Sequence, residues 1–436
     1  MRKLTHIACM LILGGMAWGQ TYKVIWNFAG APDDGANPVN GLILDTAGNL
    51  YGTTEQGGKA GTIFELMPNG DGTWSEKILY NFCANYNGDI CPDGNGPSAG
   101  LVFDSKGNLY GTTINGGVVC TWDTAGCGTV FELSPPSVQG GAWSETVLYD
   151  FCTTVENYEC IDGSFPTSQL VLDGSGNLYG TTQYGGTGKG LANGSTLGTA
   201  FELSPGSSGW TETVLYNFCS VGDQNYCPDG ASPSAGLTFD QYGNLYGTTF
   251  YGGASRGLGG GIVYELSPTS NGWTETVVHT FPYFGNGSSP AGAISLDSAG
   301  NLYSSLYNGG SAGDGGVFQL RMNPKKEHSI AFSSNDAGQP AAGVLIDEKN
   351  HVVYGTTTGN HDNYRGTVFM VDANGEITVL HNFCQQTNCT DGGNPFSTLV
   401  IDSQGNLYGT AKEGGAYGLY DPPYSYGNGV IFEITP

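Results

Sequence analysis

The feature that most constrains this chain is a phrase, Gly-Asn-Leu-Tyr-Gly-Thr-Thr, that recurs along almost its whole length. Four copies are identical and three are looser, and their central tyrosines lie about fifty to seventy residues apart. These tyrosines are Tyr51, Tyr110, Tyr179, Tyr246, Tyr303, Tyr354 and Tyr408. Self-similarity at such a period indicates radial or stacked units, each burying its apolar face on its neighbours.

Each repeat contains four strand-like runs, typified by Gly100–Asp104, the Leu-Tyr-Gly-Thr-Thr run, Gly128–Leu133 and Trp210–Phe218. The turn Ser105–Asn108 carries Gly and Asn, which tolerate the positive φ of a tight hairpin. Glycine accounts for 73 of the 436 residues and few residues are charged, which argues against long helices. The pattern therefore predicts an all-β fold, a seven-bladed β-propeller of four-stranded antiparallel blades.

The two ends of the repeat region are incomplete in complementary ways. Val24–Phe28 has the pattern of a fourth strand without the first three, and Gly429–Ile434 has that of a third strand without its fourth. We expect the N-terminal strand to complete the last blade, because this pairing closes the ring and hides two sheet edges. Residues 20–436 then form a single domain.

Residues 1–19 have the pattern of a secretory signal peptide. Arg2 and Lys3 precede the short apolar run Ile7–Met16, and small residues precede a cleavage point at Gln20. An uncleaved membrane anchor is the alternative, although the run is short for a bilayer span. The sequence therefore predicts a secreted, extracellular or periplasmic protein with no membrane insertion after cleavage.

The charge of the chain excludes some classes of partner. The formal net charge is −25, and it becomes −27 once the two basic residues of the leader are removed. Such a surface repels phosphate backbones and anionic lipids, so no nucleic-acid partner is expected.

The recurring phrases also resemble those of a known family. Gly-Asn-Leu-Tyr-Gly-Thr-Thr, Gly-Gly and Gly-Thr-Val-Phe-Glu-Leu, in this order over nearly all of residues 22–436, are similar to the GloVer tandem-repeat proteins of the exported bacterial choice-of-anchor type. The resemblance implies export and a propeller, and it implies no established activity. The Asp-x-x-Gly-Asn-Leu-Tyr turn is more distantly similar to the hairpins of NHL-type propellers.

Ten cysteines outside the leader fall into five close pairs, each within its own repeat. Export and spacing together predict the disulfides Cys83–Cys91, Cys120–Cys127, Cys152–Cys160, Cys219–Cys227 and Cys384–Cys389. Zinc is the competing interpretation, but four of the five pairs have no histidine near them in the sequence, the exception being His381 before Cys384, and each pair stands alone. No metal site is therefore assigned to them.

An acid or amide precedes a proline by four residues in every repeat. These residues are Asp34, Asp93, Asp162, Asp229, Asn286, Asp336 and Asp391. They could form a carboxylate ring at the channel mouth that holds a hard cation such as calcium, or they could shape seven equivalent turns. Sevenfold recurrence favours the turns, so no cofactor is expected. We assign structural roles for the same reason to the glutamates that recur in the third and fourth strands: Glu65, Glu132, Glu202, Glu265, Glu433, Glu76, Glu145, Glu212 and Glu275.

The long, variable loops that join fourth to first strands and second to third strands are expected on one face, where binding usually lies. Aromatic residues gather in the loops after the second strands: Trp122, Tyr184, Tyr251, Tyr307, Tyr364, Tyr417, Tyr420, Tyr424 and Tyr426. They could contact sugars or peptides, or they could pack the loops. The preferred hypothesis is a non-catalytic extracellular binding or scaffold protein whose loop face engages a glycan or a protein.

The alternative hypothesis is an enzyme. The sixth such loop contains His361 and Asp362, with Tyr364 and Arg365 close by. This group could supply general acid–base chemistry in a lyase, a lactonase or a glycoside-acting propeller, or it could be a polar exposed loop. The sequence leaves the choice of ligand open.

Overall fold

The structure is a computed structural model, and it describes residues 20–84, 86, 90–120, 124–138, 140–156, 158–188, 197–223, 225–253, 259–283, 287–310, 313–332, 338–359, 365–418, 420–421 and 425–435. The predicted signal peptide lies outside these residues. No helix in the described part of the chain is long and apolar enough to cross a membrane.

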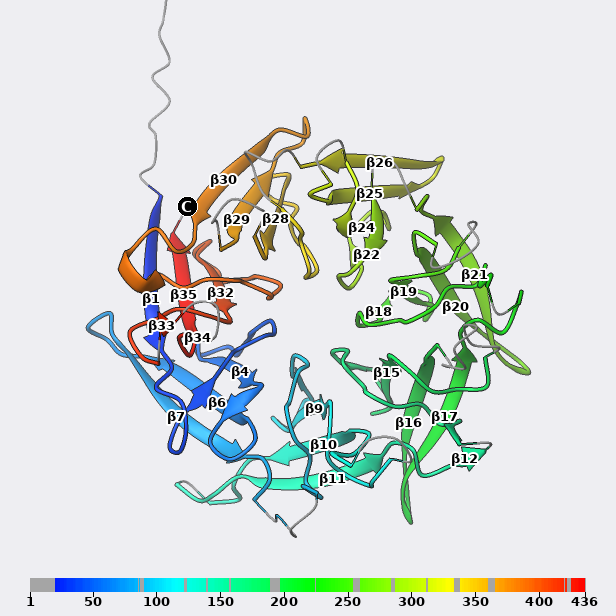
Figure 1. Cartoon of the computed structure of the whole chain (residues 1–436), viewed down its shortest axis with the longest axis horizontal. Coiled ribbons are helices and arrows are strands. Elements are labelled where there is room, and N and C mark those ends of the chain that lie inside the picture. Colours follow the sequence, from blue (N-terminus) through cyan, green and yellow to red (C-terminus); the bar gives the residue numbers. More distant parts are fainter. Residues whose placement is uncertain are drawn as a thin grey trace, which may run out of the picture.

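Seven antiparallel sheets surround a central axis, which confirms the predicted propeller (Figure 1). Blade 1 contains β3 (Ile43–Leu44), β4 (Leu50–Thr54), β6 (Thr62–Pro68) and β7 (Trp74–Asn81). Blade 2 contains β8 (Val102–Phe103), β9 (Leu109–Thr113), β10 (Thr129–Ser134) and β11 (Ser144–Asp150). Blade 3 contains β14 (Val171–Leu172), β15 (Leu178–Thr182), β16 (Thr199–Gly206) and β17 (Gly209–Asn217), and blade 4 contains β18 (Thr238–Phe239), β19 (Leu245–Thr249), β20 (Ile262–Thr269) and β21 (Gly272–Thr280).

Blades 5 to 7 follow the same plan, with one additional short strand, β22, in blade 5. Blade 5 contains β22 (Ser288–Pro290), β23 (Ser295–Leu296), β24 (Leu302–Asn308), β25 (Gly316–Met322) and β26 (Lys325–Ala331). Blade 6 contains β27 (Leu345–Asp347), β28 (Val352–Thr357), β29 (Thr367–Val371) and β30 (Ile377–Asn382), and blade 7 contains β31 (Val400–Ile401), β32 (Leu407–Ala411), β35 (Val430–Thr435) and β1 (Thr21–Asn27). Short elements decorate the loops: β2 (Gly35–Ala36), β5 (Gln56–Gly57), β12 (Val155–Glu156), β13 (Glu159–Cys160), β33 (Tyr420–Asp421), β34 (Ser425–Tyr426) and the 3₁₀ turn Thr387–Cys389.

Blade 7 joins the two ends of the chain. Its strand order is β1-β35-β32-β31, and β1 pairs antiparallel with β35 from Thr21 opposite Thr435 to Asn27 opposite Val430. The predicted closure by the N-terminal strand is therefore confirmed, and it provides β35 with a partner on its outer edge.

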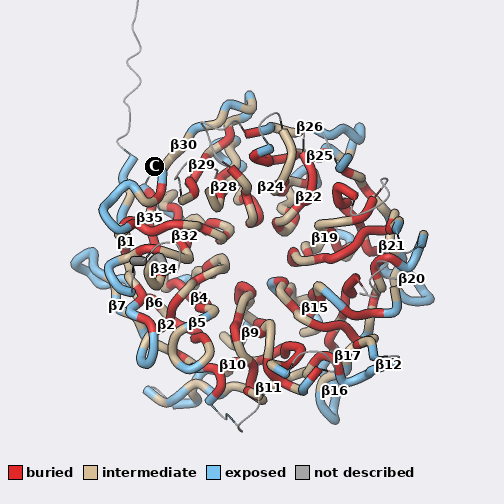
Figure 2. Tube along the Cα trace, viewed as in Figure 1, coloured by how far each residue is buried: buried red, intermediate tan, exposed pale blue. Residues whose placement is uncertain are grey.

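Packing within a blade explains the glycine of the repeated phrase. A Cβ at Gly180 would come within 2.7 Å of the Phe201 ring and 2.8 Å of Leu170. Neither neighbour can move freely, because both are buried in the apolar core between blades. Figure 2 shows this burial concentrated within the blades and exposure concentrated at the outer turns.

The threonine that follows this glycine links neighbouring blades. Its hydroxyl, or a serine hydroxyl in blade 5, donates to a backbone carbonyl next to the inner strand of the following blade. These bonds are Thr53–Ala99, Thr112–Ser168, Thr181–Ala235, Thr248–Gly292, Ser305–Ala342, Thr356–Ser397 and Thr410–Asn40, at 2.7–3.5 Å. Every junction of the ring therefore has the same buried polar link.

The five predicted disulfides form: Cys83–Cys91, Cys120–Cys127, Cys152–Cys160, Cys219–Cys227 and Cys384–Cys389. Each closes a short stretch of five to eight residues. Four of them lie in the segments that join one blade to the next, and Cys120–Cys127 lies in the loop after β9. The expectation that each pair stands alone is wrong for two of them, because the sulfurs of Cys127 and Cys160 lie 4.0 Å apart.

Candidate functional site: the loop face

Both long loops of a repeat lie together on one face of the ring. The segment entering a blade pairs with the segment that follows its second strand. Such pairs are Asn95–Asn115, Ser164–Tyr184, Ala231–Tyr251, Gly393–Glu413, β2 with β5, and β22 with the end of β24. The loop face is therefore anchored by backbone pairing, which gives the side chains on it fixed positions.

Three aromatic rings meet on this face between blades 4 and 5. The Phe250 ring centroid lies 4.9 Å from that of Tyr251 and 5.9 Å from that of Tyr307. All three residues are partly exposed. Tyr251 also packs against the buried Cys219–Cys227 disulfide. We call Phe250, Tyr251 and Tyr307 the aromatic cluster, and it spans two blades.

The structure places the other predicted aromatic residues more separately. Tyr184 is 40% exposed and its ring stands edge-on to Phe165, with 5.8 Å between centroids. Tyr417 is 53% exposed in blade 7. The backbones of Tyr420 and Tyr426 pair with each other. Trp122, Tyr364 and Tyr424 lie outside the described residues.

Sequence reasoning missed Phe250, the ring that joins Tyr251 to Tyr307. It stands directly after the Leu-Tyr-Gly-Thr-Thr run, the position that Tyr307 occupies in the next repeat and that carries Glu55, Ile114, Gln183, Thr358 or Lys412 elsewhere. Aromatic residues therefore occupy this position in two consecutive repeats, the fourth and the fifth.

Ion pairs occupy the same face around blades 6, 7 and 1. The Arg365 guanidinium lies 2.8 Å from Glu413, whose other oxygen accepts a bond from Asn394 at 3.1 Å. Lys412 pairs with Glu55 across the closing junction at 3.1 Å. Arg365 is the one described member of the predicted catalytic group, and its guanidinium is held in an ion pair. His361, Asp362 and Tyr364 lie outside the described residues.

The recurring aspartates hold turns beside the outer strands. Asp162 accepts bonds at 2.9 Å from the Tyr149 hydroxyl and from the backbone amide of Thr153. Asp93 and Asp229 make equivalent bonds, and Asp391 accepts from the backbone amide of Gln385. These contacts support the turn interpretation rather than a carboxylate ring at the channel mouth. Asn286 and Asp336 lie outside the described residues.

A glutamate of the next blade approaches four of these recurring turns, those of Asp34, Asp93, Asp162 and Asp229. The Tyr80 hydroxyl lies 2.8 Å from Asp93 and 3.4 Å from Glu145. Burial, and then the charge of Asp93, raise the pKa of Glu145 to about 7. Burial followed by the neighbouring aspartate raises the pKa of Glu212 to about 8, of Glu275 to about 7 and of Glu76 to about 9. These four glutamates therefore titrate at a higher pH than an exposed glutamate does.

Comparison with known proteins agrees with the fold. A family model described as the Gloeobacter/Verrucomicrobia repeat matches residues 16–260 and 195–422. A search of curated proteins found no match. Among solved structures, a polysaccharide lyase (ulvan lyase) is similar over 94% of this chain and 95% of its own, with a TM-score of 0.52 and 12% identity.

Two further solved structures resemble the chain. A fungal alcohol oxidase in complex with copper is similar over 95% of this chain and 76% of its own, with a TM-score of 0.51 and 12% identity. A putative 6-phosphogluconolactonase from Bacteroides uniformis is similar over 81% of this chain and 86% of its own, with a TM-score of 0.47 and 12% identity. At such identity, the two likenesses above a TM-score of 0.5 describe the propeller fold and not its activity.

Proposed function

This chain belongs to the Gloeobacter/Verrucomicrobia repeat family, and we propose that it is an exported, non-catalytic binding protein whose aromatic cluster engages glycans. The observation that carries the proposal is the position of Phe250, which brings Tyr251 of its own blade and Tyr307 of the next into one partly exposed cluster. Aromatic rings with apolar faces and polar edges suit the CH-rich faces and hydroxyl groups of sugars.

Charge restricts the ligand further. A chain with a formal net charge of −25 repels polyanions, so a neutral glycan fits better than a sulfated or uronic one. The backbone pairing of Tyr251 with Ala231 holds the cluster in position before a ligand arrives. A rigid platform loses little entropy on binding, which favours recognition by a shallow surface.

The test is a screen of the mature chain on a glycan array, followed by titration of the best neutral glycan against two variants. Phe250→Ala and Tyr307→Ala should each weaken binding by at least tenfold. Tyr242→Ala is the matched control, because Tyr242 belongs to the same blade, is 79% exposed and lies on the hairpin turn between β18 and β19. Equal weakening by the control, or preferential binding of anionic glycans, would contradict the proposal.

Two further results bear on the same proposal. N-terminal sequencing of the protein recovered from outside the cytoplasm should begin at Gln20 if export proceeds with cleavage at that point. Turnover of a glycan that disappears in His361→Ala would contradict the non-catalytic assignment.

A further inference from the structure

Tryptophans of the outer strands cover the repeat tyrosines at several junctions, on the side opposite the loop face. Trp273 of blade 4 lies against Tyr179 of blade 3, with ring centroids 6.0 Å apart and planes inclined by 65°. Trp74 meets Tyr408 at 5.9 Å and Trp210 meets Tyr110 at 6.3 Å, both in the same manner, and Trp143 packs against the cluster of Tyr51. Each indole fills the space between two blades.

Blades 5, 6 and 7 have no such indole. The equivalent position carries Lys325 in blade 5 and Gln20 in blade 7, whereas in blade 6 it carries no side chain. Val371 pairs with Ile377 as Leu266 pairs with Glu275 in blade 4, and the tryptophan stands two residues before that glutamate. The equivalent position in blade 6 is Gly375, at the tip of a shortened hairpin. A Cβ there would point at blade 5, 3.4 Å from Ile330 Cδ1.

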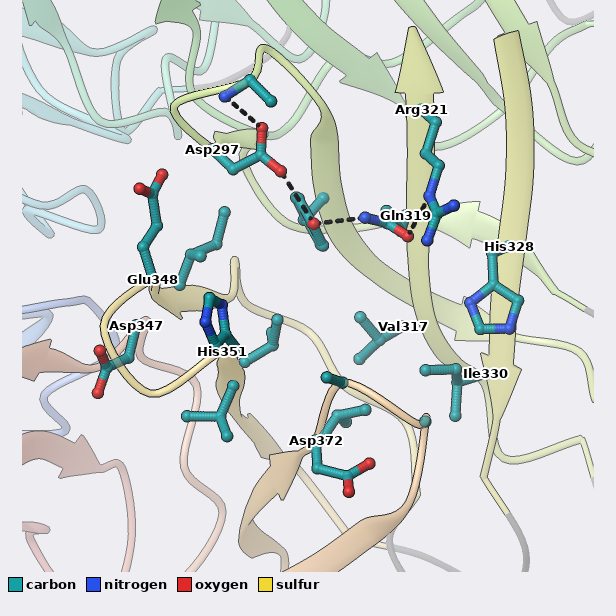
Figure 3. Close-up of a pocket in the computed structure, with 18 of the residues that line it drawn as sticks. Asp297, Val317, Gln319, Arg321, His328, Ile330, Asp347, Glu348, His351 and Asp372 are labelled. Atoms are coloured by element: carbon teal, nitrogen blue, oxygen red, sulfur yellow. Dashed lines mark hydrogen bonds between the residues drawn. The ribbon is translucent and has the colours of Figure 1, made fainter. Parts of the chain in front are cut away.

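A cavity of about 370 Å³ takes the place of the indole. Tyr303, Val317 and Ile330 line it from blade 5, and Val353 and Val371 line it from blade 6 (Figure 3). The volume lies within the range of small-molecule sites, which are mostly apolar with a few polar groups at fixed positions. At other junctions the equivalent tyrosine and apolar residues pack against an indole.

The polar wall of the cavity on blade 5 also departs from the repeat. Gln319 stands where most blades carry glutamate, Arg321 stands where blades 2, 3 and 4 carry serine, and His328 pairs with Gln319 across the strands. Gln319 bonds to the Tyr303 hydroxyl, and Arg321 Nε donates to Gln319 Oε1 at 3.2 Å, which leaves the remaining guanidinium nitrogens for other acceptors. This wall supplies donors for a carboxylate.

The opposite wall of the cavity supplies both an imidazole and carboxylates. His351 occupies the turn of blade 6 with φ +57°, and Figure 3 shows it across the cavity from His328. Asp372 accepts bonds from the amides of Asn374 and Glu376, which lower the pKa of its carboxyl and keep it ionised. Glu348 accepts a bond from the backbone of Ser298. The cavity therefore carries charges of both signs around an apolar interior.

We propose that the cavity between blades 5 and 6 binds a free aromatic amino acid, with the ring in the place of the missing tryptophan. The carboxylate lies towards Arg321 and His328, and the ammonium group lies towards Asp372. A zwitterion matches a cavity lined by both positive and negative side chains. A purely anionic ligand would be repelled by the carboxylates, and a purely cationic one by Arg321. The site lies on the opposite side from the aromatic cluster and does not depend on the glycan proposal.

The experiment is calorimetric titration of the mature chain with L-tryptophan and, separately, with N-acetyl-L-tryptophanamide. The second probe has the same indole without charges, so it represents a tryptophan side chain within a peptide. L-Tryptophan should bind at one site per chain, and the uncharged probe should bind at least tenfold more weakly. No binding of L-tryptophan, or equal binding of the two probes, would overturn the proposal.

Variants locate the site. Arg321→Ala, at an exposed position, should weaken L-tryptophan binding by at least tenfold, and Ala373→Trp should fill the cavity and abolish binding. Lys106→Ala is the control, because Lys106 is an equally exposed basic residue on the turn between β8 and β9 in blade 2. Thermal melts should show that all three variants fold. Unchanged binding in folded Arg321→Ala and Ala373→Trp would overturn the proposal.

Discussion

At the junction between blades 3 and 4, Trp273 covers Tyr179, whereas at the junction between blades 5 and 6 Gly375 offers no side chain to Tyr303. The inner parts of the two junctions are nevertheless alike. Thr181 donates to Ala235 at 3.1 Å in the first, and Ser305 donates to Ala342 at 2.7 Å in the second. The ring is therefore held by inner contacts that every repeat shares, and the outer hairpins can vary without opening it.

The outer edges of the two junctions differ in charge as well as in size. Tyr216 and Asp229 face Glu275 between blades 3 and 4, whereas Ile330 packs near Ile377 between blades 5 and 6. Burial raises the pKa of Glu275 at the first junction, whereas the second junction is apolar at this point and lies beside a cavity. The residues at the outer edge of a junction can therefore change at one junction without changing at the others.

The largest expected effect comes from the inner contacts. Gly180→Val should destabilise the protein by about 3 kcal/mol, because the new side chain overlaps the Phe201 ring. In blade 5 the equivalent residue is already Ser304, whose hydroxyl bonds to Gly292 at 2.8 Å, so Ser304→Ala should cost only about 1 kcal/mol. Urea unfolding midpoints measure both. A larger loss at Ser304 would show that the inner contacts are not equivalent.

Removal of the indole comes second. Trp273→Gly should lower stability by about 2 kcal/mol, less than a fully buried tryptophan would cost, because Trp273 is only partly buried. Trp273→Phe should recover most of this loss. A Trp273→Gly variant as stable as the parent would show that the tryptophan does not stabilise its junction. The difference between Trp273 and Gly375 would then have no effect on stability.

The pH response is the smallest of the three effects. Burial, and then the charge of Asp229, raise the pKa of Glu275 to about 7, above its value of about 4.3 in the unfolded chain. The folded state therefore binds the proton more tightly than the unfolded chain, and this difference stabilises the fold. The stabilisation is fully present below about pH 4.3 and is lost as the pH rises through about 7. We expect a loss of about 1 kcal/mol, since Glu275 is partly exposed.

Replacing the acid measures this contribution. Glu275→Gln should flatten the dependence of the unfolding midpoint on pH between 5 and 8, whereas Glu376→Gln, at an exposed position in blade 6, should leave it unchanged. An unaltered pH profile in Glu275→Gln would contradict the raised pKa assigned to Glu275.

Much of the fold could be predicted from the sequence because the repeat is also the packing unit. The glycine and the threonine of the phrase recur because each packs or bonds at every junction, and the incomplete terminal repeats predicted the pairing of β1 with β35. Cysteine spacing predicted the disulfides for a similar reason, since each pair closes a stretch of five to eight residues.

The candidate sites were harder to predict because they depend on departures from the repeat. Tyr251 and Tyr307 were identified by type, but only the structure shows Phe250 between them. The cavity lies where blade 6 has a glycine in place of a tryptophan. The match between Gly375 and Trp273 can be recognised only from the strand registers of the two hairpins. An absence of this kind carries no compositional signal.

The claim that one junction has become a ligand site is tested most directly by a crystal structure of the mature chain soaked with L-tryptophan. The account predicts the indole between blades 5 and 6, edge-on to Tyr303 and next to Gly375, with its carboxylate within bonding distance of Arg321. An indole bound elsewhere, or this cavity empty at saturating ligand, would contradict it.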